Sequence, residues 1–545
     1  MAAIFTKRTL ERIQDELTRW ETNIQLRIED WIRQYSSVFG LLILLQVAGY
    51  SYFYTLPIFN NHIFPHSWSM PYPSFKTWGE GRWFADMIIL AQGSSGVQSF
   101  QMICATMLQA VNGILLAKLV GLTSRRAILC VAGVLCMFPA FLDYYSFSID
   151  HLSFVLGDTF ALLGAWNLIW AKTYWGRVIG GAFFFLLEIA AYQPKIGVVS
   201  FLACGVVLLQ LTQDRPWSRS EAPLREALQD LSAAFLAVVG AVVLYWAITK
   251  LFITTDFSSA NANTIKYYGS RTHINTFQEA MIESSAAYRK TWDYFTAGMA
   301  GVPSDLRFLP ALALGFGIAG TLSAAWKKGT IILLLVLFIA GLTPLAIHAP
   351  YVINNHSPSD AGRILAAYGY CFAFFVSMGL AKRFARAVCA IGAAVCLYFF
   401  VILATQESNA AALKTIYEIN TINRIVARAE SVAGQEHANQ PLPVVIAGQY
   451  SSFDRVKYVN NFTGPLTPHI TSYAFKNYRQ VQMLNFFVGK DVFRSPTKAE
   501  VATAVDSMTS KAPWPSNESI YMVNGILVIL LEQYRTDLPI TWTED

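Results

Sequence analysis

The sequence predicts a polytopic α-helical membrane protein with about 11 transmembrane helices and a small C-terminal α/β domain. Hydrophobic residues make up 54% of the 545 residues and charged residues only 14%, whereas soluble domains average about 25% charge. Apolar runs recur from residue 38 to residue 404, and about 20 such residues span a bilayer. The chain becomes polar again from residue 405 onward. This composition excludes a single soluble globule, a disordered chain, a collagen and a coiled coil.

The N-terminal segment 1–37 is predicted to form an amphipathic helix. Between residues 5 and 36, apolar side chains such as Leu10, Leu17 and Trp31 recur at helical spacing, with charged residues of both signs between them. Such a helix fits the membrane interface or the cytoplasmic face of its own protein equally well. No cleavable signal peptide is expected, so the first apolar run acts as an uncleaved anchor.

The apolar runs define a transmembrane core over residues 38–404. We expect spans near 38–57, 99–121, 126–142, 151–171, 178–193, 196–213, 231–252, 308–325, 329–348, 365–381 and 386–404. Their number is odd, so the two ends of the core lie on opposite sides of the membrane.

Charge in the short loops predicts the orientation. One alternating set of loops is rich in cations: Arg125, Arg126, Lys172, Arg177, Arg215, Arg219, Arg225, Lys327, Lys328, Lys382, Arg383 and Arg386. Positive loops stay in the cytoplasm, and the net charge of +6 reflects this bias rather than nucleic-acid binding. The N-terminus is then cytoplasmic and the C-terminus periplasmic. Loops 58–98, 253–307 and 349–364 face outward.

Residues 405–545 are predicted to form a small periplasmic domain. The stretch 405–438 is polar and helical, and segments 443–447, 520–523 and 526–531 have strand composition. Asn524-Gly525 between the last two is typical of a hairpin turn. The 7 cysteines all lie in apolar runs, so neither disulfides nor a zinc site is expected.

The first outer loop holds an unusual group of polar and aromatic residues. Ionisable groups at the membrane edge are costly and therefore mark candidate sites, and glycines beside them let a backbone approach a ligand closely. The candidates in this loop are His62, Trp78, Glu80, Arg82, Trp83 and Asp86.

Further candidates lie on the same predicted side of the membrane. They are Asp143, Asp150, Tyr192, Gln193, Lys195, His356 and Arg363. Among all candidates, Arg82, Lys195 and Arg363 are suited to holding a phosphate at the bilayer surface. A carboxylate or imidazole is suited to taking a proton from an incoming hydroxyl.

Ordinary structural roles stay open for each of these residues. The cations suit snorkelling to lipid headgroups, and His62 suits a surface position. Asp143, Asp150 and also Asp158 suit helix caps or hydrogen bonds inside the bundle, and Glu188 suits a bond to a neighbouring helix. Convergence on one membrane face is a stronger signal than any single residue.

Four short motifs resemble the Gtr-type, serotype-converting membrane glucosyltransferases of bacterial surface polysaccharides. The motifs are Gly81-Arg82-Trp83, Leu115-Leu116-Ala117-Lys118-Leu119, Ala191-Tyr192-Gln193-Pro194 and Gly362-Arg363. This family belongs to the multi-span, GT-C-like glycosyltransferases. The resemblance implies a polyprenyl-phosphate-linked sugar as donor and an O-antigen-like glycan or a protein as acceptor. It also implies transfer at the periplasmic face of the inner membrane.

The resemblance also suggests roles for the candidate residues. A carboxylate in the first outer loop is usually taken as the base, and relatives often carry an Asp-Asp pair where this chain has Asn60-Asn61-His62. Glu80, Asp86 and His62 are therefore the candidate bases. Arg82, Arg363 and Lys195 would neutralise the leaving phosphate, while Gln193 assists. The residues left to bind substrate are Trp78, Trp83, Tyr192, Asp143, Asp150 and His356.

No cofactor is expected. A divalent metal stays open but is not indicated, because no DxD-type motif stands out and a lipid-phosphate leaving group does not require a metal. Two other functions stay open. A flippase for a lipid-linked sugar would also place cations at the membrane edge, although no repeat symmetry is found. A polysaccharide polymerase or ligase would act at the same face.

Overall fold

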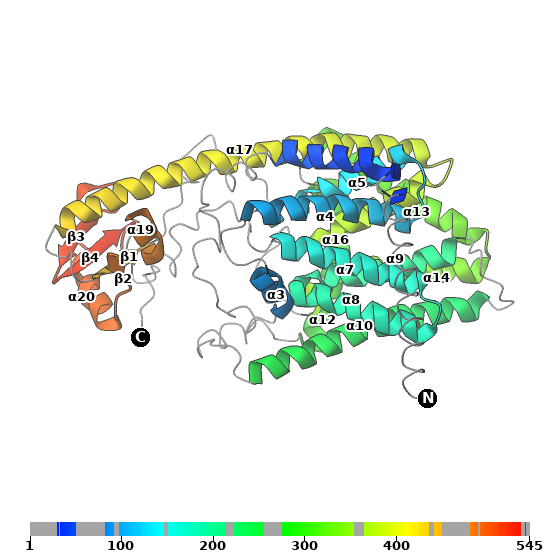
Figure 1. Cartoon of the computed structure of the whole chain (residues 1–545), viewed down its shortest axis with the longest axis horizontal. Helices are drawn as coiled ribbons and strands as arrows, with labels where there is room; N and C mark the ends of the chain where they lie inside the picture. Colours follow the sequence, from blue (N-terminus) through cyan, green and yellow to red (C-terminus); the bar gives the residue numbers. More distant parts are fainter. Residues whose placement is uncertain are drawn as a thin grey trace, which may run out of the picture.

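The computed structural model is a helical bundle followed by a small α/β domain (Figure 1). The residues it describes are 30–31, 33–50, 82–91, 98–145, 151–213, 223–254, 275–299, 301–353, 365–434, 441–448, 480–488, 491–535 and 540. The predicted N-terminal helix thus lies almost entirely outside the described residues.

Among the described residues, 8 helices are long and apolar enough to cross a membrane. They are α4 (Gln98–Leu119), α7 (His151–Trp170), α8 (Tyr174–Ala191), α9 (Ile196–Thr212), α10 (Pro223–Thr254), α13 (Phe308–Trp326), α14 (Thr330–Ile347) and α17 (Arg386–Ala433). A shorter apolar helix, α16 (Ala366–Leu380), crosses the centre of the bundle with all of its residues buried. The membrane class is confirmed in this coarse form.

The exact number of spans stays a prediction. Residues 33–49 are helical, but the described chain stops at Tyr50, within the expected span 38–57. The expected span 126–142 is interrupted: α5 (Arg125–Cys136) ends early, and Pro139 begins a 3₁₀ turn that leads into α6 (Leu142–Tyr145). Proline lacks the amide hydrogen that an uninterrupted helix would need at that point.

The loops predicted to be cytoplasmic meet at one end of the bundle. The Gln213 amide donates to the Val120 carbonyl at 2.8 Å, and Lys328 donates to the Gln213 carbonyl. Gln210 joins the same end to Leu168 at 3.2 Å. We call this the cationic end; the described cations of its loops are Arg125, Arg126, Lys172, Arg177, Arg225, Lys327, Lys328, Lys382, Arg383 and Arg386.

The opposite end, here called the site end, is built from the other ends of the same helices. It includes the start of α7, the α8–α9 junction and α15 (Ala349–Ile353). Asn275, just before α12 (Phe277–Asp293), fixes α15 by donating its side-chain amide to the Tyr351 carbonyl at 2.9 Å. Helix α3 (Trp83–Ala91) packs on α7 and α8, and its Phe84 ring meets Phe160 edge-on at 5.5 Å.

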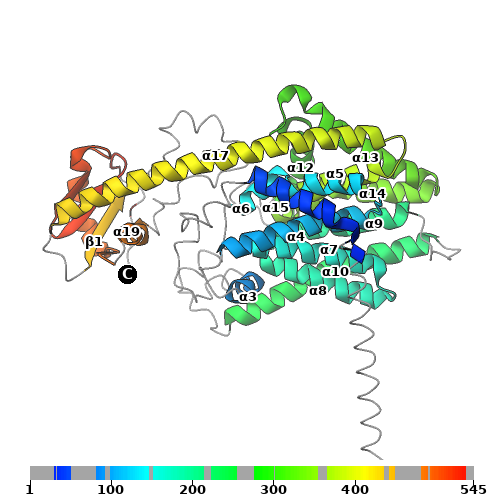
Figure 2. The same cartoon turned by 45° about the horizontal axis from the view of Figure 1, so that its top comes forward.

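Helix α17 leads from the bundle to the C-terminal domain. It starts at the cationic end, passes the site end and continues to Ala433 (Figures 1 and 2). The predicted boundary at residues 404 and 405 falls inside this one helix. At 1.5 Å per residue, 48 residues give a rod of about 72 Å, which is far longer than a bilayer requires.

The C-terminal domain is a 4-stranded sheet in the order β2-β1-β4-β3. Strand β1 (Leu442–Ala447) pairs in parallel with β2 (Phe493–Arg494) and β4 (Ile526–Leu530), and β3 (Ile520–Val523) pairs antiparallel with β4. Asn524 and Gly525 both have positive φ angles, as the predicted hairpin turn requires. One face of the sheet packs on α17 and α19 (Gln480–Val488), and the other on α20 (Lys498–Met508).

Candidate functional site

The candidate site forms where α8 ends and α9 begins. At Tyr192 the backbone becomes extended (φ −161°, ψ 108°), and Gln193–Lys195 then form one 3₁₀ turn with Pro194 near its start. Proline is well suited to the first turn of a helix because its missing amide needs no partner there. The polar residues expected between two apolar runs therefore mark a break that directs side chains inward.

A buried charge cluster lies beneath this break. The Lys195 ammonium is 2.8 Å from one Asp158 oxygen and 3.8 Å from a Glu188 oxygen, and all three side chains are fully buried. Lys195 also donates to the Phe154 carbonyl, and its ammonium lies 4.6 Å from the centre of the Tyr144 ring. These partners come from α7, α8, α6 and the 3₁₀ turn, so the cluster joins four elements.

The second Asp158 oxygen accepts a hydrogen bond from the Tyr144 hydroxyl at 3.2 Å. Glu188 packs against Gly157 so closely that a Cβ at that position would collide with its carboxylate. Glycine therefore makes room for the acid. Two carboxyl groups facing one ammonium would leave a net negative charge if all were ionised, and a buried unbalanced charge is costly.

Arg82 lies above this cluster, immediately before α3. Its guanidinium carbon is 4.9 Å from the centre of the Tyr192 ring, a cation–π distance. Tyr192 in turn packs on Phe154 with ring centres 5.0 Å apart. Phe154 is the residue whose carbonyl binds Lys195. Contacts thus run without interruption from the half-buried Arg82 to the buried charges.

The neighbouring candidates surround this line of contacts. The Gln193 side chain interacts with the Tyr245 hydroxyl of α10. Trp83 is 8% exposed and forms part of the bundle core. The structure therefore brings together four of the residues selected from the sequence: Arg82, Tyr192, Gln193 and Lys195.

The other selected residues cannot be compared with this geometry. His62, Trp78, Glu80, Asp150, His356 and Arg363 lie outside the described residues. Asp86 lies in α3 and Asp143 in α6, but their side chains lie outside the description. Their roles stay predictions.

Asp158 and Glu188 are the residues that sequence reasoning undervalued. Both were recognised as acids inside apolar runs, but neither was joined to Lys195. The signal in the sequence was the cost of burying each charge. Because Asp158, Glu188 and Lys195 lie in three consecutive helical segments, they are expected to neutralise one another.

Comparison with known proteins identifies a family for the helical bundle. A family model described as Glucosyl transferase GtrII matches residues 71–378, a range that includes α3, most of α16 and the whole candidate site. No curated protein and no solved structure matches the chain significantly. Because the matched range covers more than half of the sequence and contains the helices that build the site, the chain belongs to the GtrII glucosyltransferase family.

Proposed function

We propose that the protein transfers glucose from a polyprenyl-phosphate donor to a cell-surface glycan at the periplasmic face of the inner membrane. The acceptor is an O-antigen-like glycan or a glycoprotein. The N-terminus is cytoplasmic and the C-terminus periplasmic in this proposal. The observation that carries it is the position of Arg82: a half-buried cation held on the Tyr192 ring at the site end of a membrane bundle.

The proposed reaction is an inverting single displacement. The acceptor hydroxyl attacks the anomeric carbon, the bond from that carbon to the phosphate oxygen breaks, and the lipid phosphate leaves. A base in the first outer loop (Glu80, Asp86 or His62) takes the hydroxyl proton. Arg82, with Arg363, stabilises the charge that develops on the leaving phosphate.

We assign Lys195 a positioning role. The prediction from sequence made it a phosphate ligand, but its ammonium is enclosed and shared with Asp158 and Glu188. A cation already matched by two acids has little charge left to offer a phosphate. Instead, it fixes the turn that presents Tyr192 and Gln193, and through Tyr192 it supports Arg82.

The decisive assay uses purified protein in nanodiscs with a polyprenyl-phosphate glucose donor and the surface glycan. Stoichiometric release of polyprenyl phosphate with each glucose transferred is expected. A flippase would move the lipid without releasing it, and a polymerase would release a diphosphate.

A substitution series tests the site within that assay. Arg82→Gln is expected to lower kcat/KM by about 100-fold, because a charge-assisted contact made in the transition state is lost. Arg82→Lys should recover part of the rate, since the charge remains without the bidentate geometry. The control is Lys172→Gln, an exposed cation at the cationic end. Unchanged transfer in Arg82→Gln would refute this site.

A further inference from the structure

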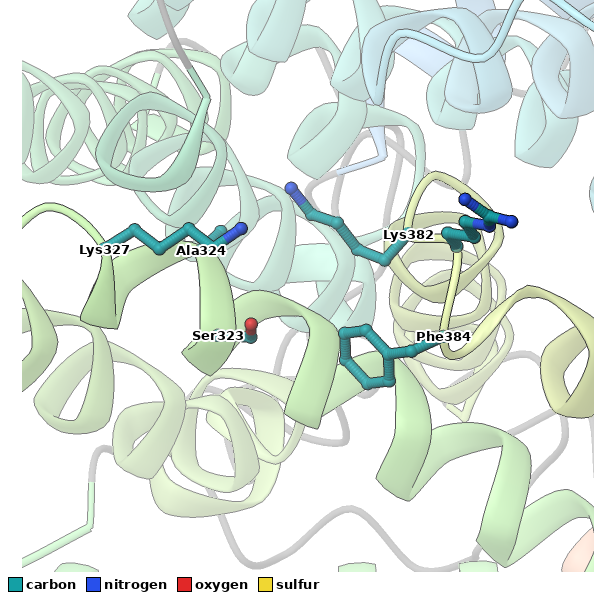
Figure 3. A pocket seen from close by; sticks show the side chains of 6 residues that line it. Ser323, Ala324, Lys327, Lys382 and Phe384 are labelled. Carbon is teal, nitrogen blue, oxygen red and sulfur yellow. The ribbon is translucent and has the colours of Figure 1, made fainter.

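A pocket of about 580 Å³ opens at the cationic end, away from the candidate site. It lies where α13 and α16 end, and its lining residues are Ser323, Ala324, Lys327, Lys382, Arg383 and Phe384. Figure 3 shows the Lys327 and Lys382 side chains extending from the two sides into the same space, with Ser323 and Phe384 below them.

The lining has three cations and no acid. Among the described residues, none of the three forms an ion pair or a side-chain hydrogen bond. Their neighbours differ: Arg177 pairs with Asp230 at 2.7 Å, Lys328 donates to the Gln213 carbonyl, and Arg386 donates to the Leu380 carbonyl at 3.1 Å. Arg386 thus already serves the carbonyl end of α16, so helix capping does not explain the other cations. Like charges around one pocket repel each other, and an anion would relieve that repulsion.

Aromatic side chains place the pocket at the membrane boundary. Trp326 is 71% exposed and Phe384 is 55% exposed, one beside each lysine. Tryptophan favours the headgroup level of a bilayer, and Phe384 adds exposed apolar surface to the pocket lining. The Lys382 stem lies along α13, with its Cγ 3.3 Å from where a Cβ on Gly320 would stand. This is the arrangement of a lysine whose stem is apolar-packed and whose charge reaches the headgroups.

An apolar furrow lies on the same helix, nearer the start of α13. This second pocket, of about 400 Å³, is lined by Phe308, Ala311, Leu312, Gly315, Phe316 and Ala319. Gly315, Ala319 and Ser323 follow at intervals of four residues, which places them on one face of a helix. Nothing lies within 4 Å of where a Cβ on Gly315 would stand. A charged pocket and a groove suited to an acyl chain therefore lie along one face of α13.

We propose that this pocket binds the phosphate headgroup of an anionic phospholipid, with one acyl chain lying in the α13 furrow. Arg383 offers a bidentate fork to the phosphate, and the two lysines act as point charges. Basic pockets between transmembrane helices are a known mode of anionic-lipid recognition. The furrow favours a lipid over free phosphate, which would leave that apolar surface unused.

Lipid binding is measured on the full-length protein in neutral detergent, without donor or acceptor. Phosphatidylglycerol is titrated against thermal unfolding and against lipid-bound species in native mass spectrometry, with phosphatidylcholine and inorganic phosphate as parallel additions. Of the three additions, only phosphatidylglycerol is expected to raise the Tm of the protein. Equal stabilisation by inorganic phosphate or by phosphatidylcholine would overturn the proposal.

Three variants distinguish lipid binding in this pocket from nonspecific attraction of anionic lipid to the cationic end. The combined change Lys327→Gln, Lys382→Gln and Arg383→Gln should weaken binding about tenfold or more. The matched control, Arg125→Gln, Arg126→Gln and Lys172→Gln, removes the same charge at the same end and should bind normally. Ser323→Leu fills the pocket and keeps every cation, so it should also weaken binding. Normal binding by Ser323→Leu, or equal weakening by the control, would refute the pocket. Since no transfer is measured, these results are independent of the proposed reaction.

Discussion

Lys195 determines the charge balance at the centre of the site. It is the one cation within 4 Å of both Asp158 and Glu188 in the described part of the bundle. Removing one partner of a buried ion pair usually costs about 3–5 kcal/mol, because the remaining charge is left uncompensated. The folded bundle therefore requires all three charged residues together, even if apolar residues in their place would stabilise it equally well.

This argument predicts the behaviour of Lys195→Met. The variant should lose about 3–5 kcal/mol of stability, seen as a lower Tm in detergent, and its transfer activity should fall. Adding Asp158→Leu should recover part of the Tm, because it removes an acid that Lys195→Met leaves unmatched. Lys172→Met, at an exposed position, is the control. An additive Tm loss in the double variant would contradict the charge-balance argument.

At the residue scale, the sequence identifies single candidate residues but does not show which of them contact each other. The cost of buried charge draws attention to Asp158, Glu188 and Lys195, and the helix break predicts the inward direction near Lys195. Which acid meets which cation depends on how α7, α8 and α9 pack, and the spacing along the chain does not contain that information. Arg82 and Tyr192 likewise lie more than a hundred residues apart and become neighbours only through the fold.

At the scale of elements, close helix packing depends on particular glycines. Gly317 of α13 faces α16 so closely that an added Cβ would collide with the Phe375 carbonyl. A backbone atom cannot move aside like a flexible side chain, so α13 would have to shift. Two residues earlier on the same helix, Gly315 has nothing within 4 Å of its Cβ position.

The two glycines give a matched prediction. Gly317→Ala should lower the Tm by several degrees and weaken the α13–α16 contact, at a cost of about 1–3 kcal/mol. Gly315→Ala should be neutral or slightly stabilising, because alanine favours helix by about 1 kcal/mol. Thermal unfolding of both proteins in detergent measures the difference. Equal Tm values would show that the helices are not in such close contact.

Helix α20 shows how local signals fix an element in the C-terminal domain. Thr497 and Glu500 form a reciprocal capping box, and Arg494 donates two hydrogen bonds to Glu500, at 3.0 and 2.6 Å. Chiefly because of these bonds, the pKa of Glu500 falls from 4.5 to about 2. A carboxyl with a lowered pKa stabilises the folded form above its unfolded pKa, and that stability is lost as the pH falls.

The expected result is a pH-dependent weakening of α20. Its amide protection from hydrogen exchange should be constant above pH 4.5 and fall as the pH approaches 2. Arg494→Gln should remove most of this dependence and cost about 1 kcal/mol, since the pair is partly exposed. A pH profile unchanged in that variant would assign the effect to other groups.

Long apolar helices were predictable, and so were the short strands β1, β3 and β4, whose composition and intervening Asn524-Gly525 turn mark them in the sequence. The runs that became α7, α9 and α14 are apolar on all sides, and their length and hydropathy are enough to predict helices that span a membrane. The two-residue strand β2 has no sequence signal of its own and exists because β1 offers it an edge. Pro139 was visible in the sequence, yet the apolar character around it masked the break in the expected span 126–142.

At the scale of the whole molecule, the two ends of the bundle have opposite character. The cationic end holds ten described loop cations and the proposed lipid pocket, while the site end holds the candidate site. Helix α17 runs past the site end, so the C-terminal domain stands beyond that end (Figure 2). If the positive-inside rule holds, the domain and the site share the periplasm, which is where the proposed reaction would meet its acceptor.

Cysteine labelling tests this orientation directly. Ser124, before α5, is an exposed residue of the cationic end, and Ser510, after α20, is an exposed residue of the C-terminal domain. In intact spheroplasts, a membrane-impermeant maleimide should label Ser510→Cys and not Ser124→Cys. After the membrane is permeabilised, both should react. The unsubstituted protein measures the background from its native cysteines, which lie within the helices of the bundle. Labelling of Ser124→Cys alone in intact cells would place the site in the cytoplasm, where a donor flipped to the outer leaflet could not reach Arg82.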